Sequence, residues 1–170
     1  MGTKGSTVLE PLWQWQGLPP LEPSAVSGSA SCALPPRYDA VRSGREFTRT
    51  TLQRWDLTAQ FDGVALVVSE LVTNALRHGL SGAAAEAEPP VRLHLVRWSA
   101  RLVCAVRDPS DEAPETTATD EDEFVDFSSE SGRGLHLVES FSDGWGWHPL
   151  SGETRGKVVW ALFRLAPEGE

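Results

Sequence analysis

Hydrophobic residues recur at helical spacing in two stretches of the first half of the chain. The apolar positions of the second stretch are Val64, Val68, Leu71, Val72 and Ala75. At about 100° per residue they share one face, which predicts a buried helix that Gly79 ends. In the first stretch, Asp39 is a candidate N-cap for a helix that runs to about Trp55. The inward positions expected there are Val41, Phe47, Thr48, Thr51 and Leu52.

The second half alternates with a period of two, which is typical of strands. Residues 91–98 and 101–108 alternate across a two-residue link, and this pattern predicts a β-hairpin. A second hairpin is expected from 142–150 and 156–165, joined around the sequence SGETRG. SCALPP, beginning at Ser31, reads as a short edge strand, and a short helix should follow Gly134. The pattern therefore predicts a mixed α/β domain with an antiparallel-leaning sheet and helices on one face.

Composition indicates one soluble domain. The chain has 170 residues, of which 40% are hydrophobic and 23% charged, enough for a real core. Residues 1–29 combine prolines with Gly and Ser without a sustained period, so we expect a disordered tail before a domain at 30–170. Cys32 and Cys104 lie far apart without a CxxC motif, and we expect both to pack as small residues in a reducing compartment.

Charge and hydropathy exclude several classes of function. The net charge of −9 argues against nucleic acid as a direct partner, because phosphate binding needs a basic surface. No apolar run approaches the roughly 20 residues of a membrane helix, and the N-terminus has no apolar signal segment. We therefore expect a cytoplasmic protein.

A polar stripe runs along the helix expected at 64–79. It consists of Glu70, Asn74, Arg77 and His78, at spacings of three and four residues. A carboxylate and an amide one turn apart can share a hydrated Mg²⁺, and Glu70 could also accept a proton. A solvated helix face is the alternative interpretation, and the stripe alone leaves it open.

Asp108 ends the second strand of the first hairpin and lies on the same face of that strand as apolar residues. This shared parity follows from alternation, since every second residue of a strand points to one face. The others on this face are Leu102, Cys104 and Val106, so the carboxylate of Asp108 should lie on the core face. A buried carboxylate is costly unless hydrogen bonds satisfy it. An adenine amino group would do so, and so would the backbone amides of the following turn.

The segment after Asp108 combines an acidic stretch with a glycine turn. Residues 109–131 hold nine acids and no lysine or arginine, which fits a mobile lid as well as a plain solvated loop. Gly132 and Gly134 then bracket Arg133 just before an apolar helical pattern. Free amides at a helix N-terminus, together with a guanidinium, can hold phosphate.

The order of these segments resembles the GHKL ATP-binding superfamily. ELVTNALRHG looks like its N-box, VRDPS like its first glycine box, GRGLHLV like its second, and GKVVWALF like its final strand. The resemblance covers about residues 30–165 and is strongest to bacterial anti-sigma factor serine/threonine kinases. It implies the Bergerat ATP-binding fold, a two-layer α/β (α+β) sandwich with a mixed, mostly antiparallel sheet, helices on one face and a mobile ATP lid at about 109–131.

The resemblance also implies roles for individual residues. Glu70 matches the catalytic base or water-positioning acid, Asn74 the Mg²⁺ ligand, and Asp108 the acid that recognises the adenine amino group. His78 matches a polar position of the N-box and Arg77 lies beside it, so the resemblance implies that both bind the nucleotide. The phosphate-side turn corresponds to Gly132, Arg133, Gly134 and Leu135. The implied activity is Mg²⁺-dependent transfer of a phosphoryl group from ATP to a protein antagonist, and this transfer would control a sigma factor. A homodimer is compatible with this activity.

The sequence departs from the family pattern in two places. The first glycine box normally has glycine two residues after the aspartate, where this chain has Ser110, preceded by Pro109. Lys157 stands where threonine often binds near the base, and we expect it to be an exposed strand residue rather than a replacement contact. The alternative function is an ATP-binding regulatory module without phosphotransfer. A histidine kinase core is disfavoured because no helical segment with a phospho-acceptor histidine precedes the domain.

Overall fold

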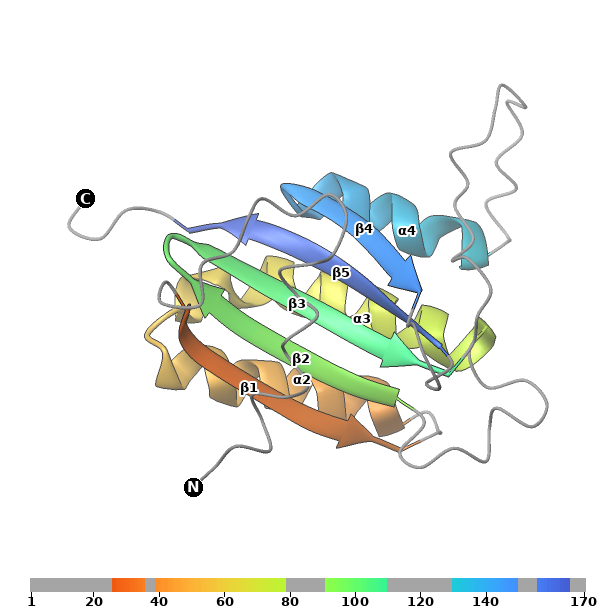
Figure 1. Ribbon diagram of the computed structural model, residues 1–170, viewed down its shortest axis with the longest axis horizontal. Coiled ribbons are helices and arrows are strands. Elements are labelled where there is room, and N and C mark those ends of the chain that lie inside the picture. Colours follow the sequence, from red (N-terminus) through yellow and green to blue (C-terminus); the bar gives the residue numbers. More distant parts are fainter. Residues whose placement is uncertain (1–25, 36–38, 79–90, 110–129, 150–155, 166–170) are drawn as a thin grey trace.

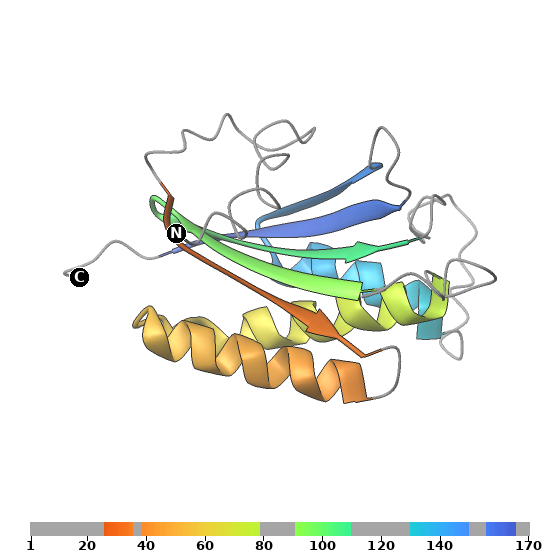
Figure 2. The same ribbon diagram turned by 60° about the horizontal axis from the view of Figure 1, so that its bottom comes forward.

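Two layers make up the part of the chain that the computed structural model describes, namely residues 26–35, 39–78, 91–109, 130–149 and 156–165 (Figure 1). One layer is a five-stranded sheet. The other consists of α2 (Asp39–Arg54), α3 (Phe61–His78) and α4 (Glu130–Phe141), which all cover the same face of the sheet (Figure 2). This arrangement confirms the predicted α/β sandwich with helices on one face.

The strands follow the order β1-β2-β3-β5-β4, and each of the four neighbouring pairs is antiparallel. They are β1 (Val26–Leu34), β2 (Val91–Trp98), β3 (Arg101–Asp108), β4 (Gly144–Pro149) and β5 (Lys157–Arg164). Both predicted hairpins are therefore confirmed, and the first turns at Ser99, whose φ is 54°. Because β5 pairs with β3 as well as β4, Lys157 comes to lie opposite Asp108.

Strand β1 begins earlier than the sequence predicts. It lies at the edge of the sheet, as expected, but starts at Val26, so residues 26–29 belong to the strand and not to the tail. The pairing with β2 satisfies backbone N–H and C=O groups whatever the side chains are. Small residues such as Gly28 and Ser29 give no hydrophobic alternation that would reveal this strand. The remaining tail, 1–25, and the loop at 79–90 lie outside the described residues.

Helix α2 ends in a Schellman motif where the sequence predicts a turn. Asp56 has a φ of 59°, a left-handed conformation that aspartate tolerates better than most residues. The N–H of Leu57 then donates to the carbonyl oxygen of Leu52 at 2.7 Å. A short 3₁₀ turn, η3 (Thr58–Gln60), leads directly into α3. This reversal sets α3 beside α2 and against the sheet.

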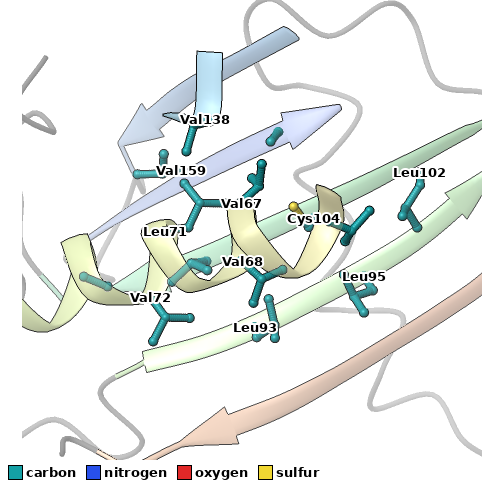
Figure 3. Packing of buried hydrophobic residues seen from close by; sticks show 14 of the residues in the cluster. Val67, Val68, Leu71, Val72, Leu93, Leu95, Leu102, Cys104, Val138 and Val159 are labelled. Carbon is teal, nitrogen blue, oxygen red and sulfur yellow. The ribbon is translucent and has the colours of Figure 1, made fainter. Parts of the chain in front are cut away.

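The main core lies between α3 and the central strands. The predicted apolar stripe of α3, from Val64 to Ala75, is at most 2% exposed. In Figure 3, Val68 and Val72 point towards Leu93 of β2, and Cys104 of β3 lies in the same layer. Each such side chain contributes about 1.5–3 kcal/mol when fully buried. Both cysteines are free, as expected, and burial raises the pKa of Cys104 to about 12.

The opposite face of the central strands is buried as well. A second apolar cluster there consists of Val96, Trp98, Val103, Ala105, Val158, Trp160 and Leu162. Burial on both faces explains why apolar runs interrupt the alternation, as in LVCAV of β3 and VVWALF of β5. His94 of β2 is also buried, and desolvation lowers its pKa to about 4, with Arg92 and Arg107 adding to the effect. None of the helices in the described ranges is both long enough and apolar enough to cross a membrane.

Candidate functional site

The segments that carry the predicted site residues meet at one end of the sandwich. The C-terminal ends of α3 and β3 lie there, together with the first residues of β5 and the first turn of α4 (Figures 1 and 2). Helix α3 packs against α4 and against β3 and β5. The fold thus gathers three motifs that are separated in the sequence. Most of the predicted lid, residues 110–129, lies outside the described ranges, and Glu130 and Ser131 are helical instead.

The polar stripe of α3 lies beside its core face. Glu70 and Asn74 are one turn apart and both half-buried, whereas Arg77 is exposed in the last turn of the helix. His78 is the last residue of α3, and its side chain is outside the described part of the structure. A half-buried position next to the core lets a side chain reach a ligand while the helix stays anchored by its apolar face. The stripe is therefore placed where a ligand could contact it.

Asp108 is buried at the end of β3, as its parity predicts, with an exposed fraction of 1%. Its Oδ1 lies 3.1 Å from Nζ of Lys157, which is equally buried. The expectation that Lys157 is an exposed strand residue is therefore wrong. Lys157 shares parity with Val159 and Ala161 of the main core, so it faces the helices, and the ion pair offsets the cost of burying its charge.

Gly156 allows the backbones of β3 and β5 to approach closely beside this pair of side chains. Its φ is +129°, a conformation that residues with a Cβ rarely adopt. A Cβ at Gly156 would collide with the carbonyl oxygen of Asp108 and would lie 3.2 Å from Cα of Pro109. The start of β5 is thus pressed against the end of β3, which only glycine permits. The same parity that predicts the burial of Asp108 could have revealed Lys157, because Lys157 begins an apolar strand.

The glycine turn belongs to α4 itself. Helix α4 begins at Glu130, not after Gly134, so the run from Gly132 to Gly134 forms part of its first turns. The first N–H groups of a helix have no intrahelical acceptors. Those same free N–H groups can bind an anion. Only the backbone of residues 130–134 is described, and the side chain of Leu135 packs in the main core at 3% exposure.

Metal binding at this end would depend on ligands from outside the protein. Within the described ranges, no group of three or more His, Cys, Asp or Glu side chains could hold a metal ion. Glu70 and Asn74 offer two oxygen-bearing side chains one turn apart. Mg²⁺ prefers oxygen ligands and commonly keeps several waters or binds phosphate oxygens. The residues present therefore fit a Mg²⁺ ion that arrives with a polyphosphate.

Comparisons with known proteins identify the family and the fold of this chain. A family model described as histidine kinase-like ATPase domain matches residues 34–163. The crystal structure of the RsbU and RsbW domains of Rv1364c from Mycobacterium tuberculosis has the same fold, with a TM-score of 0.56 and 15% sequence identity. That alignment covers 82% of this chain and 33% of the other, so this chain spans about a third of the protein it resembles. A search of curated proteins gave no match.

Proposed function

The chain belongs to the histidine kinase-like ATPase family, and we propose that it binds Mg²⁺-ATP and phosphorylates a serine or threonine of a partner protein. Asp108 is the observation that carries this proposal. A carboxylate that is 1% exposed at the end of a strand is a costly feature for a fold to keep. It lies at the same end of the sandwich as the polar stripe of α3 and the first turn of α4. A nucleotide that spans these elements would use all three.

Each part of Mg²⁺-ATP has a matching group in this chain. The Asp108 carboxylate would accept a hydrogen bond from the adenine amino group. The first-turn amides of α4 and Arg133 would hold the phosphates, with Arg77 and His78 near the nucleotide. The side-chain oxygen of Asn74 would hold the metal ion. When bound, Mg²⁺ neutralises charge on the phosphate oxygens during transfer.

Glu70 is the proposed catalytic residue. It lies one turn before Asn74 on the same flank of α3, so its carboxylate would sit close to the phosphate end of the ligand. There it would accept or orient the proton of the attacking hydroxyl group. Phosphoryl transfer needs little more from a protein than positioning and electrostatic stabilisation. The half-buried setting of Glu70 leaves it accessible to a partner's hydroxyl group.

The proposed partners follow from the motif resemblance. ELVTNALRHG and GRGLHLV resemble the boxes of anti-sigma factor kinases, and the chain shares its fold with the crystal structure that contains the RsbW domain of Rv1364c. The acceptor would then be a protein antagonist, and the regulated protein a sigma factor in the cytoplasm. A homodimer is compatible with this role.

The test compares wild type with Glu70→Gln. Glutamine keeps the size and much of the hydrogen bonding of glutamate but removes its charge. ATP affinity, measured by calorimetry, should stay within a few fold. Transfer from γ-labelled ATP to proteins that co-purify with the chain should fall by roughly 10²–10⁴. Phosphopeptide mass spectrometry would identify the labelled serine or threonine.

Glu46→Gln is the matched control, because Glu46 is an exposed glutamate on α2. It should leave both ATP affinity and transfer at wild-type levels. Equal labelling by wild type and Glu70→Gln would remove Glu70 from the mechanism. A wild-type chain that binds ATP tightly but labels no partner would instead be the ATP-binding regulatory module.

A further inference from the structure

Asp108 and Lys157 form a buried ion pair between β3 and β5. The two residues are directly opposite in the β3–β5 ladder, and backbone hydrogen bonds already join these strands. Both side chains are 1% exposed, and Nζ lies 3.1 Å from Oδ1. Buried ion pairs are usually no more stabilising than apolar residues of similar size. A lysine kept at this depth therefore points to a role in binding.

The pair presents a donor and an acceptor side by side. Asp108 alternates with Val106, and Lys157 with Val159, both of the main core, so the two side chains lie on the face of the sheet that the helices cover (Figure 2). An ammonium group carries three N–H donors, so Lys157 can donate further hydrogen bonds besides the one to Asp108. A carboxylate likewise accepts at both of its oxygens. The register of β3 and β5 places the two residues opposite each other, and Gly156 lets the strand backbones approach closely beside them.

This arrangement matches one edge of adenine. Adenine carries a donor, its 6-amino group, directly beside an acceptor, the ring nitrogen N1. Guanine and hypoxanthine reverse that order, with an acceptor at position 6 and an N–H donor at position 1. An aspartate that faces position 6 and a lysine that faces position 1 would therefore accept adenine. They would repel the other two purines, because acceptor would meet acceptor and donor would meet donor.

We propose that Lys157 is a specificity-determining residue that donates a hydrogen bond to N1 of the adenine whose amino group Asp108 binds. This assignment rests on the proposed function, since it takes ATP as the ligand. Lys157 would thus contact the base directly, although we expected from the sequence that it would be an exposed strand residue without such a contact. Discrimination of this kind is large when a buried polar group would otherwise lose its partner.

The test uses ATP and 1-deaza-ATP, which keeps the 6-amino group but replaces N1 with C–H. Calorimetry should show that wild type binds 1-deaza-ATP roughly ten- to a hundredfold more weakly, the usual value of a hydrogen bond from a charged donor. Lys157→Met keeps the length of the side chain without the charge. It should weaken ATP by a similar factor and bind the two nucleotides equally. GTP and ITP should bind wild type more weakly than ATP.

The control is Arg164→Met at the far, exposed end of β5, which should behave as wild type with both nucleotides. Equal binding of ATP and 1-deaza-ATP to wild type would overturn the assignment, and this comparison needs no variant to fold. A Lys157→Met chain that still discriminates the two nucleotides would overturn it as well. If wild type bound no ATP at all, the proposed function itself would fail, and this assignment with it.

Discussion

Asp108 and Lys157 lie at strand ends with 1% of each side chain exposed, whereas Glu70 and Asn74 lie half-buried on the flank of α3. The first pair is fixed by sheet register and by the close contact at Gly156. The second pair is fixed only by the rotation of a helix whose apolar face is anchored elsewhere. The proposed base end of the site is thus buried within the fold, while the proposed phosphate end lies at its surface. Substitutions should therefore affect stability at one end and chemistry at the other.

Removing one charge of the buried pair should have the largest effect. Asp108→Ala leaves the ammonium of Lys157 buried without its carboxylate, which should lower the free energy of unfolding by about 3–5 kcal/mol. The double variant Asp108→Leu with Lys157→Met should recover most of that loss. Glu70→Ala, on α3, should change stability by less than about 1 kcal/mol. Urea denaturation measures all three, and equal losses in Asp108→Ala and Glu70→Ala would abolish the contrast.

The same contrast between sheet and helix applies to histidines. His94 is 4% exposed on β2, and its pKa is lowered to about 4 from an ordinary 6.5, whereas His136 is exposed on α4. Between those pH values the unfolded chain binds a proton at His94 that the folded chain does not. The contribution of His94 to the free energy of unfolding is therefore fully present above pH 6.5. It is lost as the pH falls towards 4, by about 3 kcal/mol at most.

Denaturation midpoints between pH 4 and pH 7 measure this loss. His94→Gln should flatten the profile, because glutamine does not titrate, and His136→Gln should leave it unchanged. A wild-type profile as steep after the His94 substitution as before would assign the acid sensitivity to other groups.

The smallest effect on the fold is expected at Asn74. Asn74→Ala should weaken Mg²⁺-ATP binding by about 1–3 kcal/mol, because a ligand for the metal ion is lost. Unfolding should be nearly unaffected, since the side chain is only half-buried. Calorimetry with Mg²⁺ and with EDTA separates the two roles, because without the metal ion the variant and wild type should bind ATP alike. A loss of affinity that persists in EDTA would place Asn74 on the nucleotide itself.

The periodic spacing of hydrophobic residues along the chain was enough to predict most of the fold. Partial alternation predicted both hairpins. The stripe from Val64 to Ala75 predicted the core face of α3, because a helix that is buried on one face leaves a repeat in its sequence. The start of β1 was missed because Gly28 and Ser29 pair through their backbones and carry no such repeat. The start of α4 was missed because glycines near Arg133 read as a turn.

The two ends of the candidate site differ in how far the sequence predicts them. Parity predicted that Asp108 is buried, and the structure confirms it. Lys157 has the same parity signal, but lysine is so rarely buried that residue type outweighed position. A buried charge needs its partner to be known, and β5 meets β3 only in the folded sheet. The roles of Glu70 and Asn74 stay predictions, since spacing alone places them on a helix flank without a ligand.

Amide NMR of the wild-type chain during titration with Mg²⁺-ATP tests the central claim most directly, and a chain of 170 residues is within reach of the method. The claim is that one ligand contacts the end of β3, the start of β5, the stripe of α3 and the first turn of α4. The largest shift changes should therefore cluster at Asn74, Asp108, Gly156 and Lys157 and in the first turn of α4, while β1 and the first half of α2 stay unchanged. Changes centred on β1 or α2, or none at saturating ATP, would contradict the account.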